Sequence, residues 1–246
     1  MGKIIAISSG KGGTGKTTSV AAISSCLAVL GHKTLCMDFD AGLKNLDLAL
    51  SMTDFTVTDF MDVVSGRLGL SEACSENPGI PNLFFLAAPT VSEPDKPDIA
   101  ALETLFDEAR LQFDYCVVDL PSGIGYGFRQ ANANADMAII VTTGELPAMR
   151  DAQRAADAAR ETGVRDLRLL VNRVLPKNLR RIHMTIDDVI DSVGLQLIGI
   201  IQEDKSVFRA LHAGVPLILY KKKLAAYDYH DVARRISGEI VQLKQW

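Results

Sequence analysis

A glycine-rich segment placed between an apolar run and a helical segment constrains this chain most strongly. Residues 10–18 read GKGGTGKTT and directly follow the apolar run at residues 3–9. The segment fits the pattern Gly, four residues, Gly-Lys-Thr, in which a loop cradles the phosphates of a nucleotide. Glycines let the backbone curl and present N–H groups to phosphate oxygens, and a helix beginning at about Lys16 adds the partial positive charge of its first turn. The segment therefore predicts a strand, a phosphate-binding loop and a helix.

Each side chain of this loop has an expected task. Lys16 would pair with the β- and γ-phosphates, and the Thr17 hydroxyl would bind Mg²⁺. The alternative is a glycine-rich turn that binds nothing, but the four fixed positions match by chance in such a chain only roughly 1% of the time. We therefore expect a nucleotide to contact the whole loop, namely Lys11, Gly12, Gly13, Thr14, Gly15, Lys16, Thr17 and Thr18.

The rest of the chain alternates short apolar runs with longer segments of helical spacing. The apolar runs lie at residues 34–38, 83–87, 115–120, 136–142, 167–174, 196–201 and 216–219. The helical segments lie at residues 19–30, 98–112, 147–162, 185–193 and 226–243. This alternation predicts an α/β fold with a doubly wound, mostly parallel sheet, helices on both faces and functional loops at the carboxyl ends of the strands. We expect residues 1–246 to form a single domain, because α/β folds of this length often do.

Acidic residues follow two of the expected strands. Asp38 ends the run at residues 34–38, and Asp40 follows two residues later. Asp119 is the last but one residue of the run at residues 115–120, which Pro-Ser-Gly follows. Carboxylates at that edge would face the phosphate loop, where one can orient an attacking water and others can support Mg²⁺. Gly123 can bring its N–H close to the γ-phosphate. Simple capping of the strand end is the alternative for Asp38 and Asp40.

Composition argues against several classes of function. The net charge is −4, so the chain lacks the basic field that a nucleic acid or an acidic membrane would attract. No apolar run reaches the ~18 residues of a membrane-spanning helix, and the N-terminus has no signal-peptide pattern. The four cysteines have no Cys-x-x-Cys spacing, so we expect no metal site made of protein ligands alone. These features together predict a cytoplasmic protein.

Two stretches resemble one family. GKGGTGKTT with its additional Lys11, and DFDAGLKNLDL at residues 38–48, are similar to the MinD/ParA family of deviant Walker A ATPases, and most of all to its MinD-like branch. The resemblance implies about eight strands, Mg²⁺-dependent hydrolysis of ATP and a homodimer that encloses ATP. In the family the additional lysine reaches the partner's phosphates, where cationic charge stabilises phosphoryl transfer. A merely solvated Lys11 is the alternative.

The resemblance also implies roles for residues outside the loop. Asp40 would position the attacking water with Asp38 in support, and Asp119 would bind a water of the Mg²⁺ shell. Asn45 would lie near the partner subunit. A partner protein would bind near Arg150 and Asp151.

The family's base-binding segments are matched with one departure. Asn172 corresponds to the asparagine that reads adenine, because its amide suits both the N6 donor and a ring acceptor. The family usually shows Ile-Pro-Glu-Asp after the next strand, whereas this chain has Gln202 in the proline's place. The departure leaves base packing, and strict preference for ATP over GTP, open.

The resemblance predicts a switch that positions or recruits another complex, as in selection of the cell-division site. The alternatives are a cytosolic relative that places a flagellar or other apparatus, and an ATP-dependent synthetase of the same fold. At the C-terminus we expect one helical stripe, packed on the sheet, of Val232, Ile236, Ile240 and Leu243. Attachment to the inner face of the cell membrane through Lys244 and Trp246 is the alternative for this end of the chain.

Overall fold

The computed structural model of the chain describes residues 1–40, 45–55, 57–89, 98–220 and 223–244. Residues 41–44 of the acidic stretch at residues 38–48 lie outside the described residues, as does Trp246. The flanking carboxylates Asp38 and Asp40 are described, and so is Asn45. The expected site can therefore be traced on both sides of residues 41–44.

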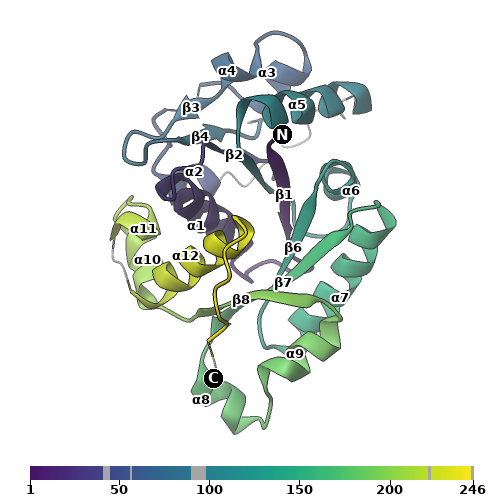
Figure 1. Cartoon of the computed structure of the whole chain (residues 1–246), viewed down its shortest axis with the longest axis vertical. Coiled ribbons are helices and arrows are strands. Elements are labelled where there is room, and N and C mark those ends of the chain that lie inside the picture. The colour runs from purple at the N-terminus through teal and green to yellow at the C-terminus, as the bar shows by residue number, and fades with distance from the viewer. Residues whose placement is uncertain (41–44, 56, 90–97, 221–222, 245–246) are drawn as a thin grey trace.

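One twisted sheet of eight strands runs through the described residues (Figure 1). The strand order is β3-β4-β2-β5-β1-β6-β7-β8, and every neighbouring pair is parallel except β3 with β4. The expected α/β fold with a mostly parallel, doubly wound sheet is confirmed. The strands are β1 (Lys3–Ser8), β2 (Thr34–Asp38), β3 (Ser75–Glu76), β4 (Leu83–Leu86), β5 (Tyr115–Asp119), β6 (Met137–Thr142), β7 (Asp166–Val174) and β8 (Gln196–Gln202).

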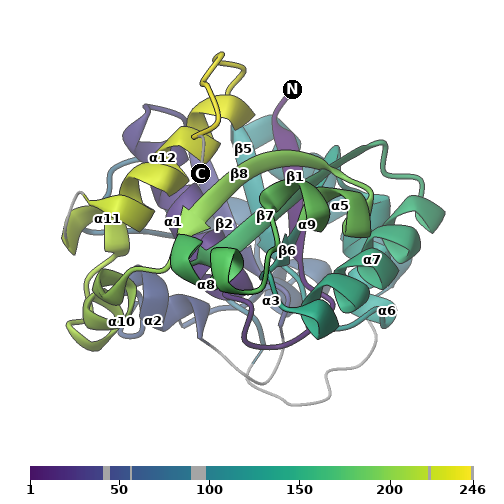
Figure 2. The same ribbon diagram turned by 90° about the horizontal axis from the view of Figure 1, so that it is seen from below.

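Apolar residues on both faces of the central strands give the sheet a hydrophobic core on each side. In β1, Ile4 and Ala6 join the core on one face, whereas Ile5 and Ile7 join the core on the other. Because alternate side chains of a strand point to opposite faces, an uninterrupted apolar run needs helices on both sides. Figure 2 shows the strands in the middle, with α1, α11 and α12 on one side and α6 and α7 on the other.

The helices divide between these two cores. Those on the first side are α1 (Lys16–Val29), α2 (Leu46–Leu50), α10 (Lys205–His212), α11 (Leu217–Tyr220) and α12 (Leu224–Ile236). Those on the second side are α3 (Phe60–Val64), α4 (Leu70–Ala73), α5 (Ile99–Gln112), α6 (Tyr126–Ala133), α7 (Leu146–Glu161), α8 (Pro176–Arg181) and α9 (Ile186–Val193). Within the described ranges, none of these helices has the length and apolar character needed to cross a bilayer.

One predicted strand is wrong. Residues 217–219 lie in helix α11 and not in a strand, and Pro216 directly precedes the helix. Leu217 and Ile218 are buried against the core around α1. A four-residue apolar run is compatible with a buried strand and with one buried helical turn, so periodicity alone could not decide. The eighth strand is β3, whose two polar residues pair antiparallel with β4 at the sheet edge.

The predicted last helix is too long. Helix α12 ends at Ile236, and Gly238 follows with φ +95° in the left-handed region. Val232 and Ile236 are buried as expected, but Ile240 is fully exposed and Leu243 is 43% exposed. The prediction is therefore wrong for the last two positions, because the glycine ends the helix as left-handed residues commonly do.

Candidate functional site

The ends of three neighbouring strands gather the expected carboxylates beside the glycine-rich loop. Strand β5 lies between β1 and β2, and its Asp119 is the direct register partner of both Asp38 and Ile7. The loop leaves the sheet immediately after β1. The parallel pairing therefore places the side chains of Asp38 and Asp119, which are 2% and 1% exposed, at the start of the loop.

The loop has an open concave side. Gly13 and Gly15 have φ of +83° and +89°, in the left-handed region that favours glycine. A Cβ atom placed on Gly12 or Gly13 would meet nothing within 4 Å. Among the described residues, no side chain caps the start of α1 at Gly15. The first-turn N–H groups and the curled backbone together form a cradle of the kind that binds phosphate.

Lys16 lies at the centre of the carboxylates. Its side chain is 7% exposed, and its ammonium donates to Asp119 and, at 3.3 Å, to Asp40. The N–H of Asp40 donates to a carboxylate oxygen of Asp38 at 2.9 Å. The structure thus brings four of the predicted site residues into one cluster, which holds three carboxylates and one lysine.

Burial within this cluster changes the acidity of its carboxyl groups. Burial, together with the neighbouring Asp119, raises the pKa of Asp38 to about 7. Burial also raises the pKa of Asp119, although the charge of Lys16 and hydrogen bonds from Lys16 and Thr17 partly oppose it. Because more carboxylates than cations are buried here, the cluster favours an additional positive charge.

The donor set fits magnesium together with a phosphate ligand. Among the described residues, no group of three or more His, Cys, Asp or Glu side chains could hold a metal ion by itself. Mg²⁺ is usually bound by one or two carboxylates and by substrate phosphates, and it keeps several waters. Thr17, Asp38 and Asp119 lie beside the phosphate cradle, so they match that mode of binding.

Lys11 belongs to the loop but lies outside the buried cluster. Its side chain is 46% exposed, and its ammonium lies 3.9 Å from the carboxylate of Glu145, just before α7. An exposed pair at this distance contributes at most about 1 kcal/mol to stability. Lys11 is therefore free to reach a neighbouring molecule at little cost.

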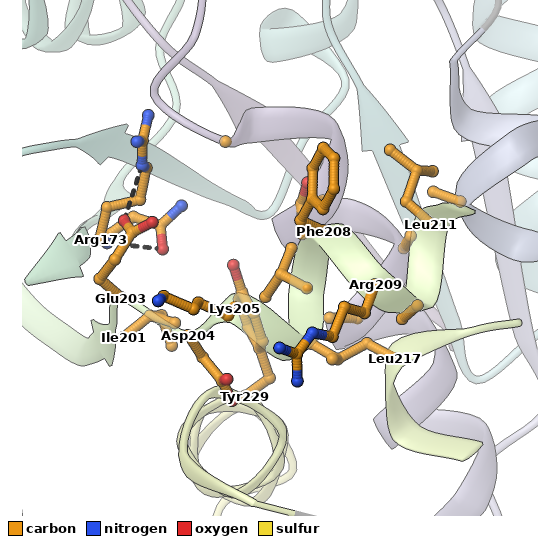
Figure 3. A pocket seen from close by; sticks show the side chains of 18 of the residues that line it. Arg173, Ile201, Glu203, Asp204, Lys205, Phe208, Arg209, Leu211, Leu217 and Tyr229 are labelled. Atoms are coloured by element: carbon orange, nitrogen blue, oxygen red, sulfur yellow. Dashed lines mark hydrogen bonds and ion pairs between the residues drawn. The ribbon is translucent and has the colours of Figure 1, made fainter. Parts of the chain in front are cut away.

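A cavity of about 690 Å³ adjoins the loop on the side of α10 and α12 (Figure 3). Asn172, at the end of β7, lines it next to Gly13 and Gly15. The Asn172 amide donates to the Thr14 carbonyl at 2.8 Å and accepts from the Arg173 N–H at 2.8 Å. The Asn172 amide also donates a hydrogen bond to the Tyr229 hydroxyl. Both of its N–H groups are therefore committed, and one lone pair of its oxygen remains for the edge of a base.

Two charged residues at this cavity were missed by the sequence reasoning. The Arg173 guanidinium donates to Glu203 at 2.8 Å and to the Gly13 carbonyl at 3.3 Å, and Figure 3 shows the first contact as a dashed line. These bonds join the segment after β8 to the phosphate loop. The position of Arg173 next to Asn172 was the available signal, but its φ of +57°, which sets the direction of the side chain, is not visible in sequence.

The remaining predicted residues lie outside this cluster. Gly123 follows β5 with φ +94° and is half-buried. Asn45 is exposed at the start of α2. Arg150 is exposed on α7, and Asp151 is its half-buried neighbour.

Substitution of Gly10 by alanine tests how the loop is packed. A Cβ atom at Gly10 would lie 2.0 Å from the carbonyl oxygen of Asp151, a backbone atom that no rotamer change can move. We expect Gly10→Ala to lower the free energy of unfolding by more than about 2 kcal/mol. Urea denaturation without nucleotide measures the change. The matched control is Gly12→Ala, whose Cβ would enter open space and whose stability should stay within about 0.5 kcal/mol of wild type. Equal stability of the two variants would contradict this packing.

The loop, the carboxylate cluster and most residues that line the cavity lie in a region that this chain shares with known proteins. Residues 5–217 match the family described as CobQ/CobB/MinD/ParA nucleotide binding domain. The chain belongs to this family. Its members carry the P-loop nucleotide-binding fold, which agrees with the eight-stranded sheet found here.

Within the MinD/ParA family, similar proteins cover nearly the whole chain. The septum site-determining protein MinD of Bacillus subtilis is 37% identical over 99% of this chain and 92% of its own length. MinD of Thermotoga maritima is 35% identical over 99% and 91%. The MinC:MinD complex of Aquifex aeolicus has a TM-score of 0.92 at 34% identity, covering 99% of both chains. MinD of Pyrococcus horikoshii complexed with Mg-ADP has a TM-score of 0.85 at 28% identity, covering 97% of both.

Proposed function

We propose that this chain is a MinD-like ATPase that binds Mg²⁺-ATP at the loop of residues 10–18 and hydrolyses it to ADP and phosphate. The observation that carries the proposal is the cluster of Lys16 with Asp38, Asp40 and Asp119 at the open side of a phosphate cradle. The Pyrococcus MinD complexed with Mg-ADP supports both nucleotide and metal.

We assign the residues roles that are compatible with their positions. Lys16 and the loop N–H groups would hold the phosphates, while Thr17, Asp38 and Asp119 would support Mg²⁺. Magnesium would neutralise charge on the phosphate oxygens when bound. Asp40, which is 19% exposed, is the accessible carboxylate of the cluster and would orient the attacking water.

The proposed base site is the 690 Å³ cavity. The Asn172 oxygen would offer its remaining lone pair to the N6 amino group of adenine, and the loop after β8 would cover the ring. A cavity in this place suits a base at the end of the phosphate cradle. A synthetase would instead need a second-substrate cavity beside the carboxylates, so this alternative gains no support from the cavity.

We further propose that ATP and Mg²⁺ join two copies of the chain. In such a dimer, Lys11 would leave its weak pair with Glu145 and reach the partner's phosphates. The presence or absence of the γ-phosphate then controls assembly, and hydrolysis releases the copies.

The output we propose is placement of the cell-division site through a second protein. The relatives named septum site-determining protein and the MinC:MinD complex of Aquifex support this task and a protein partner. The part of α7 around exposed Arg150 and half-buried Asp151 is the proposed contact surface. We propose that the dimer is cytoplasmic and that it can attach peripherally to the inner face of the cell membrane. ATP-dependent sedimentation of the protein with anionic liposomes tests this attachment.

The decisive test is the oligomeric state of Asp40→Ala. This variant keeps Lys16, Thr17 and Lys11, so it should bind Mg²⁺-ATP, fail to hydrolyse it and accumulate as a dimer. Light scattering after gel filtration should show a dimer with ATP and a monomer with ADP. The control, Lys11→Ala combined with Asp40→Ala, should stay monomeric with ATP. A monomeric Asp40→Ala protein with ATP bound would overturn the dimer proposal.

A further inference from the structure

A buried carboxylate on α12 joins the nucleotide cavity to the C-terminal segment. The Asp228 side chain is 1% exposed. One of its oxygens accepts from the Gln202 main-chain N–H at 2.9 Å and from the Gln202 side-chain amide at 3.4 Å. The other oxygen accepts from the Lys244 ammonium. Both oxygens of one buried group are therefore committed, one to the end of β8 and one to residue 244.

The contacts continue from Gln202 to the phosphate loop. The next residue, Glu203, lines the cavity and accepts from Arg173, which in turn donates to the Gly13 carbonyl. Glu203 is also held in place by its N–H, which donates to the Val174 carbonyl at 3.1 Å. Hydrogen bonds and ion pairs, together with the peptide bond between Gln202 and Glu203, thus connect Lys244 to Gly13.

Helix α12 contacts the same site a second time. Tyr229 reaches from α12 toward the cavity (Figure 3), and its hydroxyl lies 3.0 Å from the Ser19 hydroxyl on α1. Ser19 donates to the Gly15 carbonyl at 2.8 Å. Asp228 and Tyr229, two adjacent residues of α12, therefore both contact residues around the cavity. A shift of α12 would change these contacts.

Among the described residues, Arg235 holds the start of the C-terminal segment at residues 241–242, and Lys244 binds Asp228 at its end. Arg235 donates to the carbonyls of Val241 and Gln242 at 3.0 and 2.9 Å, and to that of Ile198 on β8 at 3.0 Å. The Lys244 side chain is 44% exposed, so its ammonium can leave Asp228 for solvent. When it does, one oxygen of a buried carboxylate loses its cationic partner, which is unfavourable.

We propose that Asp228 couples the docking of residues 241–244 to occupancy of the nucleotide-base cavity. Docked Lys244 holds Asp228 against Gln202, and this fixes the segment that covers the base. Because coupling between two sites is reciprocal, nucleotide binding must hold residues 241–244 more firmly as well. A protein or surface that draws these residues away would then loosen the nucleotide. The inference rests on the nucleotide-binding part of the proposed function.

Gln202 provides an internal control. The family pattern that this segment resembles has proline there, and proline has no N–H to donate to Asp228. Gln202→Pro therefore removes the link between Asp228 and the base segment while leaving Lys244 and Asp228 in place. The effect of a substitution at Lys244 should disappear in that background.

The test is the affinity for Mg²⁺-ADP carrying a fluorescent ribose label. We expect Lys244→Ala to weaken binding about fivefold, the lower end of typical coupling between sites. In Gln202→Pro, addition of Lys244→Ala should change affinity by less than about twofold. Lys223→Ala, which removes an exposed lysine at the start of α12, is the matched control and should bind as wild type does. Hydrogen exchange at residues 241–244 should slow when Mg²⁺-ADP is added.

The outcomes separate two kinds of failure. If wild type fails to bind Mg²⁺-ADP, the proposed nucleotide function fails and the coupling with it. If wild type binds but Lys244→Ala binds equally well, only the coupling is overturned. An equal loss in the wild-type and Gln202→Pro backgrounds also overturns it, because the effect would then bypass the main-chain link. Unchanged hydrogen exchange at residues 241–244 counts against it independently.

Discussion

Lys16→Met should eliminate measurable ATP hydrolysis and also lower the free energy of unfolding by about 3–5 kcal/mol. Lys16 is the buried counter-charge of Asp119 and Asp40, so its removal leaves buried carboxylates without a cation. The same ammonium would pair with ATP phosphates in the proposed complex, which is why activity and stability should fall together. Phosphate release measures the first effect, and urea denaturation without nucleotide measures the second.

The controls separate charge from burial. Lys11→Met makes the same chemical change in the same loop at a half-exposed position, and its stability should stay within about 0.5 kcal/mol of wild type. Lys16→Met combined with Asp119→Asn removes one unpaired charge and should recover part of the lost stability without recovering activity. If Lys16→Met is as stable as wild type, the carboxylates do not depend on this lysine.

Lys11→Ala should reduce ATP turnover by about 10³-fold or more while leaving the affinity of the monomer for Mg²⁺-ADP within about twofold of wild type. The reason is geometric. Lys11 pairs with Glu145 and not with the buried cluster, so its charge becomes useful only when it enters another copy's site. Steady-state hydrolysis and nucleotide binding, measured on the same preparation, test both parts. Glu145→Ala is the control and should leave turnover nearly unchanged.

A mixing experiment decides whether Lys11 acts across the dimer. Lys11→Ala and Asp40→Ala proteins should each be inactive alone. In a mixed dimer, the site that retains Asp40 receives Lys11 from the other copy, so mixing should restore turnover. If Lys11 acts within its own chain, each site lacks one of the two residues and mixing restores nothing.

The sequence was a good guide wherever a single local signal determines structure. The loop between β1 and α1 was predicted because the glycines, Lys16 and the flanking apolar run have no other common use. The strands β5, β6 and β7 were predicted because buried parallel strands are nearly continuous in apolar residues. By contrast, residues 216–219 are too few for periodicity to distinguish a helical turn from a strand, and polar β3 has no such signal at all.

The candidate site was predicted in its residues but not in its contacts. Parallel strands end at one edge, so the proximity of Asp38 and Asp119 to the loop followed from sequence. That Lys16 binds two carboxylates at once, or that Asn172 holds Thr14, depends on side-chain geometry. The link from Asp228 to Gln202 joins residues from a helix and a strand that are distant in the chain, and no local pattern indicates it.

The close approach of Gly10 to the main chain of Asp151 would link the proposed nucleotide site to the outer surface of the protein. Helix α7 has 16 residues and a length of about 24 Å, and a helix of that length moves as a stiff rod. The loop lies against this helix at Asp151, one residue from the exposed side chain of Arg150. The atoms that a Cβ on Gly10 would meet first are the main-chain carbonyl oxygen and carbon of Asp151. If the loop moves toward α7 at Gly10, helix α7 must therefore tilt or shift. The proposed partner-binding surface around Arg150 would move with it.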